Sequence, residues 1–186
     1  MLRNFIITIF SSLLLLTNVN AEKTTVFDFT DEEFKTLKVG KKYEGETTWT
    51  LGSNEKGNFI KAEAEGKGSG VGKEVLINLS KTPFINITWK VEKDLSGIIE
   101  NSKKGHDYAA RVFVIKKTGS TALSNRAINY LFSSNNEVGK NWPSPYTKKS
   151  IDYVLSTTQE NLDTWVTVKA NVKEDFMKLH GINVED

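Results

Sequence analysis

The run KKGHDYAARVFVIKK, residues 103–117, is strongly β-forming, yet it holds an acid, Asp107, and a guanidinium, Arg111, around two alanines. Successive side chains of a strand point to opposite faces of the sheet. One face of this run is apolar apart from a phenol: Tyr108, Ala110, Val112 and Val114. The other face carries Asp107, Ala109, Arg111, Phe113 and Ile115. We expect the first face to look into a core and the second to form a polar surface.

Two other runs divide in the same way. In FINITWKVE, residues 84–92, the apolar set is Ile85, Ile87, Trp89 and Val91. In RAINYLFSS, residues 126–134, Ile128, Tyr130 and Phe132 alternate with Asn129, Leu131 and Ser133. If the three strands are adjacent, their mixed face displays polar side chains around the hollow left by Ala109: Thr88, Lys90, Asp107, Arg111 and Asn129.

Short strand-like runs separated by Gly, Asn, Ser and Pro recur along the chain, with almost no helical periodicity. The expected strands are 24–29, 42–51, 58–65, 71–79, 84–92, 107–116, 127–133, 150–156 and 164–172. This spacing predicts an all-β fold, an antiparallel β-sandwich or jelly roll of galactose-binding-like or lectin-like type. No linker or internal repeat interrupts it, so we expect one domain over residues 22–186.

Capping residues predict two short helices within this β framework. Thr30 followed by Glu33 forms a capping box, which starts a helix after the first expected strand. Asn171 with Glu174 repeats the box, and Gly181 supplies a left-handed stop.

The first residues, MLRNFIITIFSSLLLLTNVNA, have the layout of a secretory signal peptide over 1–21. Arg3 precedes an apolar stretch of about 12 residues, which is shorter than the roughly 20 that a membrane-spanning helix needs. We therefore expect cleavage after Ala21 and export to a periplasm or the extracellular space, with no membrane attachment afterwards.

Composition narrows the function classes. The 186 residues hold 25 Lys and Arg against 23 Asp and Glu, without a basic block, so nucleic acid is not an expected partner. There is no cysteine, which excludes a disulfide scaffold, and two distant histidines do not make a zinc site. No metal and no cofactor are expected.

The candidate ligand-binding residues are Lys90, Asp107, Arg111, Asn129, Tyr130 and Trp142. Each has a structural alternative. Asp107 and Arg111 could instead be structural, with Arg111 bridging strand carbonyls or a carboxylate by its bidentate fork. Trp142 and Tyr146 lie in NWPSPYT, where prolines stiffen the backbone, and could form a sugar platform or close the end of the sandwich. If the protein is an enzyme, Asp107 is the expected acid or base, with His106 or Tyr130 assisting.

Several of these segments together resemble an uncharacterised bacterial family, domain of unknown function 3047. The resemblance lies in LSKTPFINITWKVE, INYLFSS, NWPSPYT and TWVTVKANVKEDFMKLHG, and most specifically in the Gly105–Arg111 run GHDYAAR. It implies a secreted sandwich, and it assigns no catalytic role to any residue because the family's activity is not established. The family carries an acid where this chain has His106, which weakens a paired-acid or metal site there. Family members also continue past the Phe176 helix into a strand segment, so the resemblance implies a C-terminally shortened domain with an unpaired edge open to a partner strand.

The leading functional prediction is a non-catalytic binding module for a glycan or a similar polar ligand. The alternatives are a glycan-acting hydrolase or lyase, and a structural or partner-binding envelope protein. No nucleophile elbow, phosphate loop or His-Glu-x-x-His motif occurs in the sequence.

Overall fold

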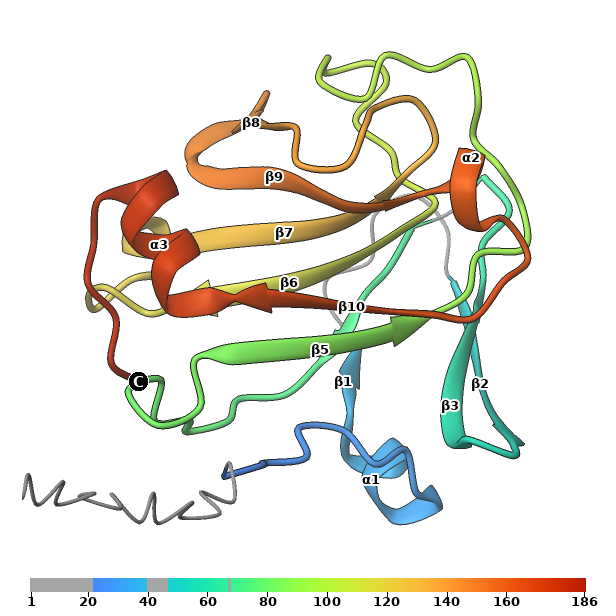
Figure 1. Ribbon diagram of the computed structural model, residues 1–186, viewed down its shortest axis with the longest axis horizontal. Helices are drawn as coiled ribbons and strands as arrows, with labels where there is room; N and C mark the ends of the chain where they lie inside the picture. Colours follow the sequence, from blue (N-terminus) through green and yellow to red (C-terminus); the bar gives the residue numbers. More distant parts are fainter. Residues whose placement is uncertain (1–21, 40–46, 67) are drawn as a thin grey trace, which may run out of the picture.

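A computed structural model describes residues 22–39, 47–66 and 68–186, and the expected signal peptide lies outside these ranges (Figure 1). The described residues form ten strands, three short α-helices and one 3₁₀ turn. In chain order they are α1 (Asp31–Thr36), β1 (Lys38–Val39), β2 (Thr48–Asn54), β3 (Gly57–Glu63), β4 (Val71–Gly72), β5 (Phe84–Trp89), β6 (Ala110–Lys116), η1 (Ala122–Ser124), β7 (Arg126–Ser133), β8 (Asn141–Ser144), β9 (Thr147–Thr157), α2 (Thr158–Asn161), β10 (Val166–Asn171) and α3 (Val172–His180). The predicted all-β class with few short helices is confirmed.

The largest sheet has the strand order β6-β7-β9-β8, and three two-stranded sheets pair β10 with β5, β2 with β3, and β1 with β4. Most pairs are antiparallel as predicted, but β7 and β9 are parallel. The reason is the inserted strand β8, which turns back into β9 and so makes β9 run in the direction of β7. The predicted strand at 24–29 is not formed, and of the predicted strand at 71–79 only Val71–Gly72 pairs.

The main core lies between the inner faces of β5–β10 and of β6–β7–β9. Ile87 and Trp89 of β5 meet Ile128 and Phe132 of β7, and the Trp89 and Phe132 rings are 5.4 Å apart. These side chains are those that the alternation placed inward. Since truncating a buried aromatic typically costs about 3–5 kcal/mol, this contact joins the two layers firmly.

The outer face of β7 is also buried, contrary to the prediction of a mixed, solvated face. Asn129, Leu131 and Ser133 are at most 1% exposed. Leu131 packs in a second small cluster with Tyr108, Val154 and Trp142. The segment that leads into β6 and the strand β8 therefore cover this side, because a central strand of a layered domain has neighbours on both faces.

Both predicted helices are present with their caps. The Thr30 hydroxyl accepts from the Glu33 N–H at 3.2 Å, and the Asn171 side chain accepts from the Glu174 N–H at 3.2 Å. Gly181 ends α3 in the left-handed conformation, with φ of 68°. No helix within the described residues has the length and apolarity needed to cross a membrane.

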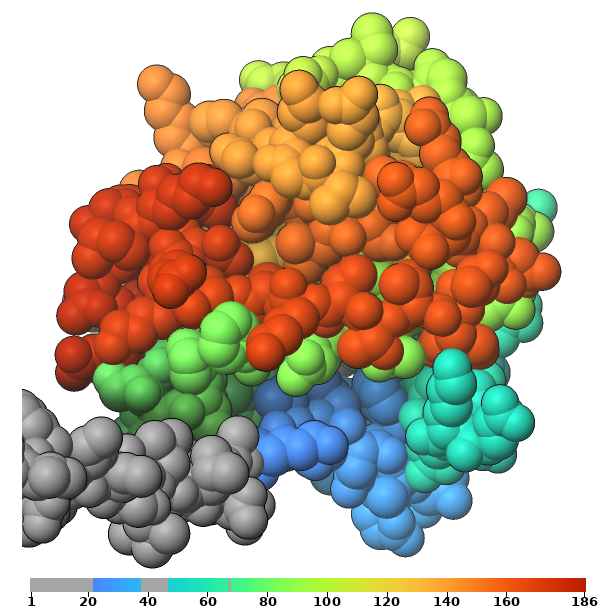
Figure 2. Space-filling model, viewed as in Figure 1, coloured from blue at the N-terminus to red at the C-terminus, as the bar shows by residue number. Residues whose placement is uncertain are grey.

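The C-terminal residues pack against the rest of the domain. Phe176 and Val184 are 1% and 2% exposed and join the main core, and the Leu79 N–H donates to the Glu185 carbonyl at 2.8 Å. Figure 2 shows this red segment and β10 covering one side of the molecule, with α1 and the β2–β3 hairpin along its lower edge.

Candidate functional site

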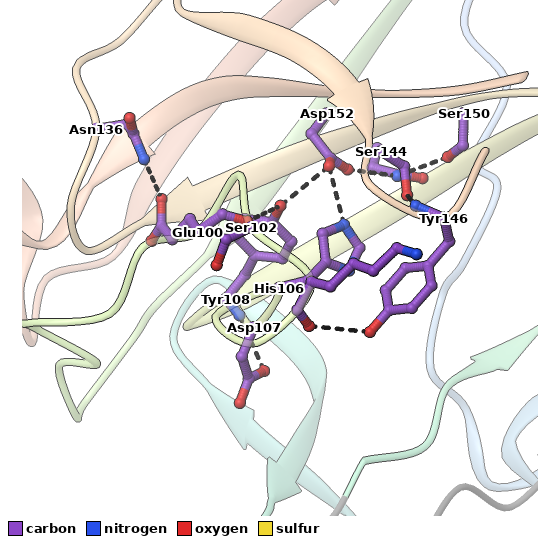
Figure 3. Close-up of polar contacts among 12 residues, drawn as sticks. Glu100, Ser102, His106, Asp107, Tyr108, Asn136, Ser144, Tyr146, Ser150 and Asp152 are labelled. Carbon is purple, nitrogen blue, oxygen red and sulfur yellow. Dashed lines mark hydrogen bonds and ion pairs between the residues drawn. The ribbon is translucent and has the colours of Figure 1, made fainter. Parts of the chain in front are cut away.

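A buried carboxylate, Asp152, lies on the outer face of the four-stranded sheet. Tyr153 and Leu155 of β9 pack toward the main core, so Asp152 points to the opposite side. It is 0% exposed and accepts three hydrogen bonds: from Asn129 Nδ2 at 2.6 Å, from the Tyr108 hydroxyl at 3.0 Å and from His106 Nε2 at 3.0 Å. A buried charge is costly unless it is fully hydrogen-bonded, and these three donors meet that need (Figure 3).

Tyr108 is one of the three residues that donate a hydrogen bond to Asp152. It is 7% exposed, and burial together with the Asp152 charge raises the pKa of its hydroxyl above the usual value of 10.0. The phenol therefore stays protonated and donates to Asp152 across the physiological pH range.

His106 is a second residue that donates a hydrogen bond to Asp152. Its side chain is 10% exposed, and its ring meets the rings of Tyr108 and Tyr146 edge-on, with centroids 5.2 and 5.3 Å away. Because a carboxylate only accepts, the bond to Asp152 places a proton on Nε2. The second ring nitrogen, Nδ1, has no hydrogen-bond partner among the described residues and is not sealed from solvent.

A second buried carboxylate, Glu100, fixes the segment that carries His106 and Tyr108. Glu100 is 1% exposed and accepts from the Ser133 hydroxyl, the Ser134 N–H and the Asn136 amide at 2.5, 2.8 and 2.6 Å. The loop before β6 is thus tied to the end of β7, which holds His106 in a defined position.

Arg111 of β6 stands beside this network on the exposed part of the outer face. Its guanidinium lies 4.6 Å from the centroid of the Phe113 ring and 5.6 Å from that of Tyr108. Within the described ranges it forms no hydrogen bond and no ion pair. Phe113 is 47% exposed, so the stacked pair faces solvent.

An exposed aromatic ring lies beside this network, and exposed lysines flank it along the chain. Tyr146 is 66% exposed, and its hydroxyl donates to the Lys103 carbonyl at 3.0 Å. Four exposed lysines lie on the segments that bracket it, namely Lys103, Lys104, Lys148 and Lys149. We call the surface formed by His106, Arg111, Phe113 and Tyr146 the outer-face site.

The predicted site residues are only partly brought together. Asp107 is exposed, accepts from the Tyr108 N–H at 2.9 Å and points away from Asp152 and His106 (Figure 3). His106, expected to assist Asp107 if the protein is an enzyme, is instead hydrogen-bonded to Asp152. Arg111 lies on the outer face as expected, whereas Asn129 is buried beneath it.

Three further residues of the predicted site lie away from the outer-face site or beneath it. Tyr130 is 0% exposed in the main core, where its hydroxyl donates to Asp175 at 2.8 Å. Lys90 follows β5 in the opposite layer, where it pairs with Asp163 at 2.7 Å, a hydrogen bond that raises the pKa of Lys90. Trp142 packs on Leu131 and Val154 with its indole nitrogen buried, which is the structural alternative rather than a sugar platform.

Sequence reasoning missed Asp152 as a site residue. The signal available was an acid between Ile151 and Tyr153 inside a run that otherwise predicts a buried strand. A lone acid at such a position requires donors from another segment, but the alternation does not say which segment provides them. Within the described residues no group of three or more His, Cys, Asp or Glu side chains is placed to hold a metal ion.

Comparison with known proteins adds a family. The family model described as protein of unknown function (DUF3047) matches residues 32–186. No curated protein and no solved structure matches the chain.

Proposed function

The chain belongs to the DUF3047 family, and we propose that it is a glycan-binding module that holds an acidic sugar polymer on the outer-face site. One observation carries this proposal. The Arg111 guanidinium is stacked over two aromatic rings and has no anionic partner among the described residues.

The chemistry of this arrangement favours an anion. A guanidinium offers parallel N–H donors that match a carboxylate or a sulfate, and it is only weakly hydrated. Stacking on Phe113 restricts the side chain before a ligand arrives, which lowers the entropy lost on binding. An acidic ligand therefore binds a guanidinium whose side chain is already ordered.

The surroundings of Arg111 favour a sugar polymer among acidic ligands. The exposed rings of Phe113 and Tyr146 offer apolar surfaces on which the C–H face of a pyranose packs. The four lysines on the flanking segments add a positive electrostatic field that extends beyond the length of one sugar unit.

Binding to four polysaccharides tests this proposal. We expect polygalacturonate and alginate, which carry carboxylates, or dextran sulfate to retard the purified protein in affinity electrophoresis, while neutral dextran does not. Comparing the acidic polymers identifies which anion is preferred. Binding should weaken with added salt, because the lysines are exposed.

Arg111→Ala is expected to lower the affinity at least about 10-fold, since a charge-assisted hydrogen bond contributes roughly 1.5–3 kcal/mol. Arg111→Lys should fall in between, because an ammonium lacks the planar fork. Lys169→Ala is the matched control: its ammonium lies 4.0 Å from the Phe84 ring on the other layer, so it removes a similar stacked cation elsewhere. Equal binding by Arg111→Ala and the wild type would remove the site assignment. Failure of all four polymers to bind would favour a structural or partner-binding role instead.

We also propose that the chain is exported and matures at Glu22. The support is the charge, apolar length and small residues of segment 1–21. Mass spectrometry of the protein recovered from a secreting bacterial host checks this, and an intact N-terminus in the cytoplasm contradicts it.

A further inference from the structure

We infer that the outer-face site also cleaves the acidic polymer, with His106 as the general base of an eliminative reaction on a uronate unit. This inference rests on the proposed binding of a carboxylated glycan. It goes beyond binding because a ligand-binding surface does not require a histidine oriented by a buried carboxylate.

His106 has the arrangement that a general base needs. The bond from Nε2 to Asp152 fixes the tautomer, so the lone pair is on Nδ1. Nδ1 forms no hydrogen bond with any described residue and is not one of the buried polar atoms without a partner. The edge-on contacts with Tyr108 and Tyr146 hold the ring plane.

Arg111 supplies the second requirement. A proton on the carbon next to a carboxylate is weakly acidic, because its removal places further negative charge on the carboxylate. A guanidinium bound to that carboxylate stabilises the developing charge. The His106 ring and the Arg111 guanidinium lie 5.2 and 5.6 Å from the centroid of the same Tyr108 ring, so the base and the cation both flank one side chain of the outer face.

The step balances without an oxidant, a reductant or water. Nδ1 removes the proton from C5 of a 4-linked uronate, the C5–H electrons form a C4=C5 double bond, and the C4–O4 bond breaks with its electron pair on O4. The imidazolium of His106 then returns the proton to O4, directly or through a solvent water. The products are an unsaturated uronate end and a new reducing end.

Hydrolysis fits this site less well. Cleavage of a glycoside by the common route uses two carboxyl groups about 5–9.5 Å apart that face the bond. Here Asp152 and Glu100 are buried and already accept several hydrogen bonds, and Asp107 points away. Elimination needs only one base and one cation, which the site has.

The test measures binding and product formation separately on the same protein with polygalacturonate and alginate. The wild type is expected to generate the ultraviolet absorbance of the conjugated double bond. His106→Gln is expected to lose about 10²–10⁴-fold in rate, the usual contribution of a general base, while its affinity in affinity electrophoresis falls far less than its rate, because the Arg111 contact to the polymer is kept. His180→Gln is the matched control, because the only other histidine lies on α3 and bonds the Ala127 carbonyl.

Asp152 is a positioning residue, and its variant has a distinct signature. In Asp152→Asn the amide no longer stabilises an imidazolium as a carboxylate does, so the acid limb of the pH–rate profile should move to lower pH. Loss of folding is checked by the unfolding transition.

The outcomes separate the two proposals. Polymer bound without unsaturated product, or unchanged turnover by His106→Gln, overturns the eliminative role and leaves binding intact. Absence of binding to both polymers overturns this inference together with binding of carboxylated glycans.

Discussion

Single residues in this protein are held by donors that arrive from distant parts of the chain. Glu33 illustrates this in α1. Burial opposes its charge, but hydrogen bonds from Lys73 and from the Phe29 and Asp28 N–H groups prevail and lower the pKa of Glu33 from 4.5 to about 2. The sequence predicted the cap and its helix from local spacing, whereas the Lys73 contact, 40 residues away, has no local signal. The same limit applies to Asp152.

The Glu33 interactions predict a pH-dependent loss of stability in Glu33→Gln. The folded-state pKa lies below the unfolded value, so the stabilisation is complete above pH 4.5 and is lost as the pH falls toward 2. We expect a cost of about 1 kcal/mol at pH 7, as for other helix caps, in urea unfolding.

Glu32→Gln, an exposed acid in the same turn, is the control and should change little. A deficit in Glu33→Gln that is equally large at pH 2 would contradict the role assigned to its charge.

At the scale of elements, the loop before β6 carries His106 and so positions part of the outer-face site. Its path is close-packed at Gly105, where a Cβ would lie 2.5 Å from the Ile99 carbonyl oxygen. Backbone is the obstacle there, so no side-chain movement relieves the clash. The sequence singled out this glycine as part of the run GHDYAAR but gave no reason for it, because its partner belongs to a loop that periodicity does not describe.

Gly105→Ala is expected to destabilise the protein by about 1–3 kcal/mol through overpacking. The displaced loop should also move His106, so polymer cleavage should fall more than core stability does. Thermal unfolding and product formation are compared with Gly70→Ala, where a Cβ meets nothing within 4 Å. Equal behaviour of the two variants would show that the loop tolerates the extra atom.

For the whole molecule, alternation predicted the faces of the regular strands but could not predict layers. It was wrong just before β6, where Tyr108, expected inward, lies in the outer cluster and Ala109, expected outward, packs against the main core. It placed Trp89 inward and Lys90 outward, and placed Val112 inward and Arg111 outward, as observed. However, two strands that share a core from opposite layers expose their outer faces on opposite sides of the molecule. Lys90 and Arg111 are therefore separated by the core that their neighbours build. The parallel β7–β9 pair was missed because strand direction depends on β8, which the sequence presented as a proline-stiffened loop.

The contact between Asp175 of α3 and Tyr130 of β7 predicts that removing the Asp175 charge increases the free energy of unfolding. Burial raises the pKa of Asp175 despite the opposing hydrogen bond from Tyr130. A raised folded-state pKa contributes stability below the unfolded value of 3.8 and loses it as the pH rises through the folded value. At pH 7 the fold thus carries the cost of a buried charge.

Asp175→Asn keeps an acceptor for Tyr130, so we expect it to be at least as stable as the wild type at pH 7, with an advantage that shrinks on acidification. Tyr130→Phe should instead cost about 1–3 kcal/mol, because it leaves the carboxyl group without its donor. Calorimetric melting between pH 3 and pH 7 measures both, and a less stable Asp175→Asn at pH 7 would refute the sign.

Burial of β7 on both faces sets where this family member accepts mutations. In β6 every second position faces solvent, so a saturation scan should show a striped profile there, with Arg111 standing out in binding alone. In β7 all positions from Ile128 to Ser133 are buried, and the profile should be uniformly intolerant. In relatives, amino-acid substitutions would then concentrate at the exposed, alternate positions of the outer strands, while the central strand stays nearly constant.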